Sequence, residues 1–469
     1  MKLDENHDVT FRDTLSTIDE KGKRNWVFAK KPKGKIYNYR KLFAYSLLTF
    51  LFVVPFIKVH GEPLLLFNVI ERKFIIFGVI FWPQDSFLFY LMMLSFILFI
   101  VLFTVVYGRL FCGWACPQTV FLEFIFRPVE WLIDGNPAKQ KKIKTQVWNL
   151  EKISKRLLKH ILFWLLSFFI VSAMLSFVLG AENVISFLKH PFPEHKSGFI
   201  ALIIFTSAFY FIYAWFREQV CSIMCPYGRL QSVLIDPNTI VVSYDYLRGE
   251  PRGFAKKGDI EAAEKLGDCI DCKHCVYVCP TNIDIKNGTQ LECVNCTACI
   301  DACNATMTRI GKPKGLIRFA SENGIKTGKN FKLTPRNIAY TVVLTGIVIF
   351  FLTMLLTRPA VEANIIRDRN ILPQIQNDSA VNVYNVKILN KTHKNLNLTI
   401  KPQNFKGNLK FFGDNLTIKS GEKTESKMII YIPKTELKNK NSILRFGIYS
   451  EGKLIEKVES NFVGPDINH

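Results

Sequence analysis

The sequence predicts a multidomain membrane protein that combines a five-helix α-helical transmembrane bundle, a cysteine-rich domain and a C-terminal β-sandwich. First, several runs of 18 to 21 residues carry no charge, and each is long enough to cross roughly 30 Å of hydrocarbon as a helix. Second, all twelve cysteines lie between Cys112 and Cys303. Third, short alternating runs separated by turn residues fill the chain after position 359. Together these features exclude a purely soluble enzyme.

Five segments are predicted to span the membrane, and they are 42–57, 86–106, 161–180, 199–216 and 337–357. The stretch 63–83 is also apolar, but Glu71, Arg72 and Lys73 lie at its centre. We therefore interpret it as an interfacial hairpin or short strands.

The basic residues predict the topology. Lys and Arg number 11 up to position 41, 10 in 107–159 and 17 in 217–336, against two each in 59–85 and 181–198. Because basic loops tend to stay in the cytoplasm, we expect a cytoplasmic N-terminus and cysteine-rich domain, and a C-terminal domain outside. About 40 mostly charged and polar residues precede the first apolar run, which argues against a cleavable signal peptide.

Segment 1–40 is predicted to be a flexible basic arm. Four of its lysines, Lys30, Lys31, Lys33 and Lys35, lie close together and would contact anionic membrane lipid. The formal net charge is +22, but basic loops beside spans explain such a charge more often than nucleic-acid binding does. We therefore predict no nucleic-acid partner.

The most specific signal is a duplicated cysteine motif, Cys-x2-Cys-x2-Cys-x3-Cys, with the spacing of bacterial ferredoxins that hold two [4Fe–4S] clusters. In such domains the fourth cysteine of each copy binds the cluster of the other copy. The prediction is a ferredoxin domain whose first cluster is bound by Cys269, Cys272, Cys275 and Cys303, and whose second is bound by Cys293, Cys296, Cys299 and Cys279. A pair of zinc knuckles is the alternative, which the duplication and Pro280 disfavour.

The other four cysteines form two Cys-x3-Cys-Pro motifs, after the second and the fourth span, and they are Cys112, Cys116, Cys221 and Cys225. Amphipathic helices are predicted after them, over 118–134 and 227–236. Because residues four apart lie on one side of a helix, two such pairs would form a four-thiolate pocket suited to Cu(I), zinc or an iron–sulfur cluster. The alternative is four buried free cysteines. Stable binding of copper or a third metal centre, and a transient encounter with it, both remain open.

Histidine is scarce. Only His160 touches the edge of a predicted span, which disfavours a membrane haem with two histidine ligands. His274 lies between two cluster ligands and is predicted to tune that cluster through hydrogen bonding. No GxGxxG unit follows a strand, so no nucleotide site is predicted.

Seven strands are predicted in the C-terminal part, at 382–389, 395–401, 408–412, 415–419, 427–432, 443–449 and 453–461. About seven strands in roughly 110 residues are typical of an immunoglobulin-like sandwich. This part contains no cysteine, and we expect a spacer or a module that docks a partner. The predicted division is an arm at 1–40, four spans with both Cys-x3-Cys-Pro motifs at 41–240, a ferredoxin domain at 241–335, a fifth span at 336–358 and the sandwich at 359–469.

Several motifs together resemble one known family. They are Phe111-Cys-Gly-Trp-Ala-Cys-Pro-Gln-Thr-Val, the run 244–252, the paired ferredoxin motifs and Lys314-Gly-Leu-Ile-Arg318. The family is the cytochrome c oxidase accessory protein family CcoG, also called FixG or RdxA, and the likeness runs from about position 38 to the C-terminal sandwich. The only departure is the missing proline after Cys303.

The resemblance implies a bacterial inner-membrane protein with two [4Fe–4S] clusters and a periplasmic immunoglobulin-like domain. It implies a role in assembling the cbb-type oxidase, with reduction of Cu(II) to Cu(I) as the activity. The cluster ligands would be the eight ferredoxin cysteines, and the copper-related residues would be Cys112, Cys116, Cys221 and Cys225. Expected partners are copper as substrate and oxidase subunits or copper-handling assembly proteins; a homo-oligomer is left open.

We hypothesise a one-electron relay in which a donor reduces the clusters and the electron passes to Cu(II) near the Cys-x3-Cys-Pro motifs. One alternative is a quinol dehydrogenase that passes electrons to a periplasmic partner. Another is a non-catalytic assembly scaffold whose clusters are structural or sense oxygen. The electron donor does not follow from the sequence.

Overall fold

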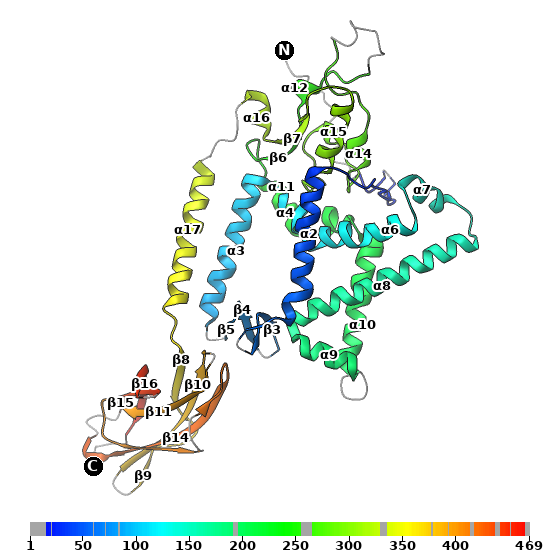
Figure 1. Ribbon diagram of the computed structural model, residues 1–469. Coiled ribbons are helices and arrows are strands. Elements are labelled where there is room, and N and C mark those ends of the chain that lie inside the picture. Colours follow the sequence, from blue (N-terminus) through cyan, green and yellow to red (C-terminus); the bar gives the residue numbers. More distant parts are fainter. Residues whose placement is uncertain are drawn as a thin grey trace. The chain divides into compact units, whose positions relative to one another are not determined.

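The computed structural model describes residues 16–19, 21–59, 61–70, 72–82, 85–190, 196–254, 265–328, 335–376, 379–392, 394–412, 417–436, 441–450 and 452–464. The chain forms two compact units. The first consists of Met1–Ile57, Pro63–Asn68 and Tyr90–Val348, and the second of Lys58–Glu62, Val69–Phe89 and Ile349–His469. The ferredoxin domain thus shares one unit with most of the membrane helices (Figure 1).

Five helices in the described part of the chain are long and apolar enough to cross a membrane. They are α2 (Lys35–Val53) with the short turn η1 (Val54–Phe56), α3 (Ser86–Tyr107), α8 (Leu150–Leu179), α10 (Lys196–Phe211) with the π-helical turn η4 (Ile212–Phe216), and α17 (Pro335–Leu356). The five predicted spans are confirmed as helices. Four of them begin earlier than predicted, at Lys35, Leu150, Lys196 and Pro335, because each helix includes polar residues that precede the apolar run. Asn149, for example, caps α8 by accepting a hydrogen bond of 2.9 Å from the Lys152 N–H.

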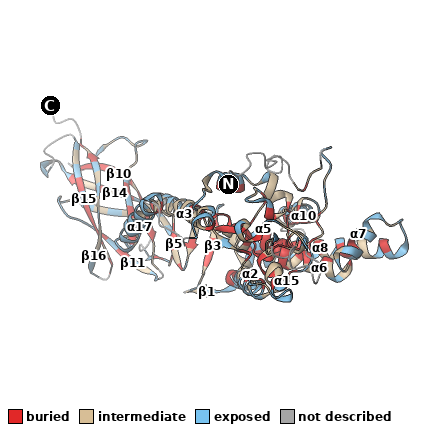
Figure 2. Cartoon of the chain, turned by 90° about the horizontal axis from the view of Figure 1, so that it is seen from above, coloured by how far each residue is buried: buried red, intermediate tan, exposed pale blue. Residues whose placement is uncertain are grey.

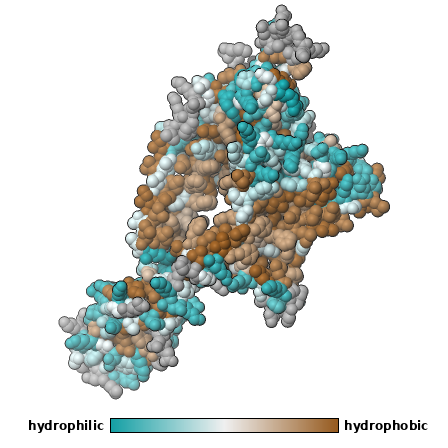
Figure 3. All heavy atoms as spheres, viewed as in Figure 1, coloured by the Kyte–Doolittle hydropathy of each residue, from teal (hydrophilic) through white to brown (hydrophobic). Residues whose placement is uncertain are grey.

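Apolar side chains cover the outside of these helices, whereas the ferredoxin part of the first unit is largely hydrophilic (Figure 3). The 18-residue apolar window of α17 has no buried residue, and only 11% of the window in α3 is buried. Helices that are apolar all round are buried or span membranes. This surface identifies the chain as a membrane protein.

Short helices between the spans complete the membrane part of the first unit. After α3 come α4 (Leu110–Trp114), α5 (Pro117–Phe121), the π-helical turn η3 (Leu122–Phe126), α6 (Arg127–Ile133) and α7 (Pro137–Thr145); later come α9 (Ala181–Lys189), the π-helical turn η5 (Val220–Met224) and α11 (Pro226–Leu234). Aromatic rings hold them to the spans. Phe126 of η3 stacks on Tyr213 of η4 with ring centres 4.6 Å apart and meets Phe163 of α8 edge-on at 4.9 Å. Buried residues lie in these short helices as well as in the strands of the C-terminal part (Figure 2).

The ferredoxin domain lies between α11 and α17 in the chain. Strands β6 (Val241–Tyr244) and β7 (Ile317–Ala320) pair antiparallel. Between them in the sequence lie the helical segments α12 (Tyr246–Gly249), α14 (His274–Tyr277), η6 (Ile285–Asn287) and α15 (Ala298–Arg309), and α16 (Glu322–Thr327) follows β7. Ile285, Ile300 and Met307 are buried around the cysteines. The metal-binding loops are therefore pinned by a small apolar core.

The N-terminal arm differs from the prediction. Residues 1–15 lie outside the described residues, but much of the segment after them packs against the rest of the first unit and is not a free arm, while Lys30, Lys31, Lys33 and Lys35 are exposed. Ser16 donates to the Thr281 carbonyl at 2.7 Å, the Lys30 N–H donates to the Tyr277 carbonyl at 2.8 Å, and Arg24 pairs with the buried Glu218 at 3.1 Å. Residue composition alone did not show these contacts, because the partners lie far away in sequence.

The second unit contains the predicted hairpin. The apolar stretch after α2 forms β1 (Lys58–Val59), β2 (Glu62–Pro63), β3 (Leu65–Asn68), β4 (Lys73–Ile76) and β5 (Val79–Phe81). Strand β3 belongs to the first unit, whereas β4 and β5 belong to the second. Strands β4 and β5 pair antiparallel around Phe77 and Gly78, which both have positive φ, at 49° and 80°. Two-residue turns of this kind match the twist of a hairpin. The interpretation as short strands is confirmed.

The C-terminal part is a sandwich of two antiparallel sheets. One has the order β12 (Asn408–Phe412), β14 (Lys423–Pro433), β10 (Ser379–Asn390) and β8 (Val361–Arg367), with β9 (Gln374–Gln376) also on β10; the other has the order β13 (Thr417–Ile418), β11 (Leu396–Pro402), β15 (Asn441–Ser450) and β16 (Lys453–Val463). All seven predicted strands correspond to described strands, although residues 415 and 416 lie outside the described part. Strands β8 and β9 were not predicted. Tyr384, Met428 and Phe446 are fully buried between the sheets.

One buried carboxylate joins the hairpin to the sandwich within the second unit. Asp85 pairs with Arg358 at 2.5 Å and with Lys391 at 2.7 Å, and all three side chains are at most 9% exposed. Lys391 also pairs with Glu362 at 2.6 Å. The predicted domain division placed the hairpin with the membrane spans, whereas these ion pairs hold it to the sandwich.

Asp85→Asn should destabilise this unit. The change leaves the buried Arg358 without a counter-charge, and removing one partner of a buried pair typically costs about 3–5 kcal/mol. The measurement is thermal unfolding of the full-length protein in detergent. Glu425→Gln is the matched control, because the ion pairs of Glu425 with Lys387 and Lys423 are exposed and should contribute nothing measurable. Equal effects of the two changes would contradict this role of Asp85.

Candidate metal centres

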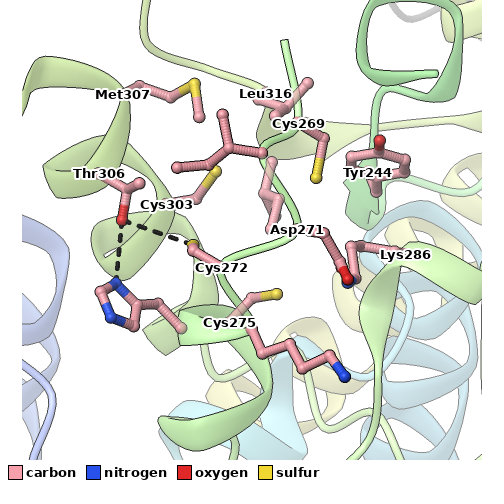
Figure 4. Close-up of a pocket in the computed structure, with 14 residues that line it drawn as sticks. Tyr244, Cys269, Asp271, Cys272, Cys275, Lys286, Cys303, Thr306, Met307 and Leu316 are labelled. Carbon is pink, nitrogen blue, oxygen red and sulfur yellow. Dashed lines mark hydrogen bonds and ion pairs between the residues drawn. The ribbon is translucent and has the colours of Figure 1, made fainter. Parts of the chain in front are cut away.

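The eight ferredoxin cysteines form two groups in space. One hollow is lined by what we call the first set, Cys269, Cys272, Cys275 and Cys303. Their sulfur atoms turn toward one space in Figure 4, with Cys303 supplied by α15 and the other three by α14 and the loop before it. A second hollow is lined by the second set, Cys279, Cys293, Cys296 and Cys299, and also by Cys275. The structure therefore brings the fourth cysteine of each motif to the cysteines of the other.

Equivalent backbone turns shape the two cysteine loops. Asp271 and Lys273 have φ of 49° and 55°, and Asn295 and Thr297, at the same positions of the second motif, have φ of 52° and 66°. Left-handed residues within such loops turn successive N–H groups toward one side and make anion-binding concavities. The Asn295 N–H bonds to the Cys293 sulfur. These turns give each set the N–H donors that a negatively charged cluster needs.

The sulfur atoms fit a cluster better than a single ion. In the described part of the chain, no three His, Cys, Asp or Glu side chains lie close enough together to hold one metal ion. A tetrahedral zinc site needs four ligands at about 2.0–2.3 Å from one ion, whereas a [4Fe–4S] cluster takes one thiolate at each iron and suits a wider spacing. This geometry favours [4Fe–4S] clusters over the zinc alternative.

Burial keeps these thiols protonated until metal binds. It raises the pKa of Cys275 and Cys293 to about 12, and that of Cys296 and Cys303 to about 11. Because metal ligands must be deprotonated, binding displaces these protons. Loading is thus coupled to the folding of the loops around the metal.

The two hollows differ in their linings. The first contains the polar side chains of Asp271, His274, Lys286 and Thr306, and Lys286 forms an ion pair with Asp271 (Figure 4). The second is lined apart from its cysteines mainly by apolar residues and threonines. His274 bonds through Nδ1 to the Thr306 hydroxyl at 3.1 Å, and that hydroxyl lies 3.9 Å from the Cys272 sulfur. The predicted influence of His274 on the cluster therefore runs through Thr306.

The two cysteines of each Cys-x3-Cys-Pro motif do not lie on one helix. We call Cys112 and Cys116 the first pair, and Cys221 and Cys225 the second pair. Cys112 lies within α4, whereas Cys116 precedes α5 with extended backbone, at φ −61° and ψ 125°. Cys221 and Cys225 have the same relation to η5 and α11. The premise that both members share one helix is wrong, because a proline disfavours helical backbone at the residue before it.

All four of these thiols nonetheless lie near one another. A thiolate at Cys225 would raise the pKa of Cys112, Cys116 and Cys221 by charge repulsion, and these three thiols affect one another in the same way. Burial raises the pKa of Cys112 to about 11 and that of Cys221 to about 12. They are grouped, but no three of the four are close enough to share one ion.

The first pair touches the second set directly. Cys112 and Cys296 are buried in one apolar cluster with Val294 and Ala298. Between the two cysteines of the pair, Gly113 packs so tightly on this loop that an added Cβ would lie 3.0 Å from the backbone N and Cα of Cys296. Arg40 donates to the Gly113 carbonyl at 2.7 Å and fixes it from the other side. The two cysteine groups are thus in van der Waals contact.

Buried ion pairs hold the second pair against the first. Arg217, at the start of the second motif, makes two hydrogen bonds of 2.7 and 2.8 Å to Glu130 of α6. Its carbonyl accepts from Gln118, just after the first pair, at 3.0 Å. Burial alone would raise the pKa of Glu130, but Arg217 and Lys159 outweigh it and hold that pKa below its usual value. The charged pair therefore fixes the relative position of the two motifs.

Sequence reasoning missed the residues that connect these groups. In the sequence, Gly113 is simply the residue after Cys112, and Arg109 and Arg217 are basic residues shortly before the two motifs. Nothing in these positions indicated a contact with the cluster loops. Gln231, which accepts a hydrogen bond of 2.9 Å from the Cys112 sulfur, carried no signal. Their partners are distant in sequence, so spacing could not reveal them.

Fold and cysteine geometry together define a membrane iron–sulfur electron-transfer protein. Residues 216–322 match a family described as "4Fe-4S dicluster domain", and residues 89–136 one described as "4Fe-4S binding domain". Residues 351–465 match "IG-like fold at C-terminal of FixG, putative oxidoreductase". The immunoglobulin-like and ferredoxin predictions are confirmed.

Relatives of known name cover most of the chain. It is 32% identical over 421 residues to the nitrogen fixation protein FixG of Rhizobium meliloti (strain 1021), covering 81% of this chain and 80% of the relative. Proteins RdxA and RdxB of Cereibacter sphaeroides are 34% and 32% identical, over 70% and 79% of this chain and 71% and 80% of their own lengths. The chain belongs to the FixG/RdxA family.

Proposed function

We propose that this protein reduces Cu(II) to Cu(I) at the Cys-x3-Cys-Pro pairs, with electrons that arrive through its ferredoxin domain, for assembly of the copper centre of a cbb-type cytochrome c oxidase. The observation that supports it most is the contact of Gly113 and Cys112 with Cys296. Electron tunnelling slows steeply with distance, so groups in contact form the fastest route out of the second set.

The step balances as a one-electron transfer. Each Cu(II) ion takes one electron and becomes Cu(I), and one reduced iron–sulfur cluster is oxidised. When bound, the clusters supply low-potential electrons one at a time. The chain's own residues hold the second set against the first pair and exclude water from the contact, where Cys112 and Cys296 are each less than 9% exposed.

The four pair thiols suit copper as a substrate. Sulfur is a soft ligand that favours Cu(I), which makes reduction easier once Cu(II) has been captured. Because no three of these thiols are preassembled around one ion, Cu(I) would be held by few ligands and could leave by ligand exchange. This fits passage to oxidase subunits or copper-handling proteins better than storage.

The charge distribution supports the orientation that goes with this function. The ferredoxin domain and both pairs would face the cytoplasm of the bacterial inner membrane, because 10 and 17 basic residues follow the second and fourth spans. The immunoglobulin-like domain would then lie in the periplasm. With no cysteine, it would dock a partner and would not carry electrons.

The test is stopped-flow optical and EPR spectroscopy of anaerobic, dithionite-reduced protein, freed of excess dithionite and mixed with Cu(II). Parallel loss of the reduced-cluster and Cu(II) signals is the expected result. Persistence of both signals would reject copper reduction. A quinol titration of the oxidised protein would then separate the quinol dehydrogenase from the assembly scaffold.

Replacing Cys112 and Cys116 with serine should abolish copper reduction and leave the iron content unchanged, because neither residue belongs to the two cluster sets. The assay is the same mixing experiment with iron quantified in parallel. Ser222→Ala, beside Cys221 but without a thiol, is the control and should behave as the unchanged protein. Normal copper reduction by the double variant would refute the assignment of this site.

A further inference from the structure

Arg109 is a buried cation without an acidic partner. It precedes α4 directly after the second span, and only 4% of its surface is exposed. Among the described residues, its Nη1 bonds to a backbone carbonyl, no carboxylate forms an ion pair with it, and its Nε has no hydrogen-bond partner. An uncompensated charge in such a place is costly, so negative charge from another source is expected beside it.

Arg109 lies between three cysteine-bearing segments of the chain. It stands three residues before Cys112 of the first pair. Its Nη1 donates to the Leu291 carbonyl, which lies two residues before Cys293. A Cβ at Gly228 would lie 2.6 Å from Nη2 and 3.1 Å from the Cys221 carbonyl, so this glycine leaves room for the guanidinium beside the second pair.

We propose that Arg109 is the shared counter-ion of the second set and the two Cys-x3-Cys-Pro pairs. Its positive charge stabilises the electron on the second cluster and the thiolates that receive copper, and it thereby raises the reduction potential at this end of the path. Arg109 is a positioning residue: it acts on the metal centres through the sulfurs it faces. The role for the pairs rests on the proposed function, whereas the role for the second cluster does not.

Arg40 provides a comparison within the same contact. It is also buried, at 1% exposure, and its charge acts on Cys296. Its Nε donates to the Gly113 carbonyl, between the two cysteines of the first pair, at 2.7 Å. Arg40 is therefore a second buried cation at the contact of the first pair with the second set, whereas Arg109 also lies beside the segment of the second pair.

The test is an EPR-monitored redox titration of the full-length, cluster-loaded protein without copper. Arg109→Met should shift one cluster to a more negative potential and leave the other unchanged, and Arg109→Lys should restore most of the shift because it keeps the charge. Arg40→Met should shift the same cluster. In the copper assay, Arg109→Met should slow reduction and Arg109→Lys should restore most of it, because a nearby cation favours the thiolate form that binds copper.

Unchanged potentials in Arg109→Met, with full iron content, would overturn the proposal. Loss of one cluster in Arg109→Met but not in Arg109→Lys would support it, since charge and not shape would then be required. Loss in both would assign Arg109 a purely structural role and overturn it. A potential shift in Arg109→Met, combined with no copper reduction by the unchanged protein, would leave the role for the second cluster standing and reject the proposed function.

Discussion

Cys279→Ala is expected to remove the cluster held by Cys293, Cys296 and Cys299, although Cys279 belongs by sequence to the other motif. The hollow that Cys279 lines is the second one, so its loss leaves three ligands there and all four at the first. Iron content should fall by about one half. Copper reduction should stop, because the remaining cluster does not share the contact with the first pair.

Cys303→Ala is the matched variant. It should also remove about half of the iron, but from the first set, which Cys303 completes. The second set and its contact with Gly113 stay intact, so protein reduced directly by dithionite should still pass an electron to Cu(II). If Cys303→Ala stopped copper reduction and Cys279→Ala preserved it, the order of the two clusters in the path would be wrong.

Gly113→Ala should slow copper reduction severalfold while both clusters remain. The added methyl group would meet the backbone of Cys296 at 3.0 Å and the Val294 carbonyl at a still shorter distance. Neither is a flexible side-chain end, so the loop and α4 must separate, and overpacking of this kind costs about 1–3 kcal/mol. The measurements are the rate of cluster oxidation by Cu(II) and the melting temperature.

Gly346→Ala in α17 is the control for Gly113. No atom lies within 4 Å of a Cβ at that position, and alanine is a better helix former than glycine. Its copper reduction and stability should not fall. Unchanged copper reduction in Gly113→Ala, despite a measurable loss of stability, would show that the electron leaves the second set by another route.

Buried ion pairs fix the segments that carry the two Cys-x3-Cys-Pro motifs. Arg217 with Glu130 holds α6 against the start of the second motif, so the segments that carry the two pairs lie at fixed positions. Arg24 reaches from the N-terminal segment to Glu218, the next residue. The segment expected to lie on lipid thus helps to brace the second motif.

Local patterns in the sequence determined much of this protein. Uncharged runs identified the five spans, because a membrane helix needs only its own composition to be recognised. Cysteine spacing predicted two cluster sets and the exchange of Cys279 and Cys303, because a ferredoxin loop is defined within a dozen residues. Alternation predicted most strands of the sandwich, since one face of each strand is buried.

Tertiary structure decided what joins these parts. The contact of Gly113 with Cys296, the hydrogen bond of Arg109 to Leu291 and the ion pair of Asp85 with Arg358 link residues from about 180 to more than 270 positions apart. No periodicity or spacing records such a contact, because each partner looks ordinary in its own segment. The chemistry of the ligands is therefore local, whereas the route of the electron depends on packing between distant segments.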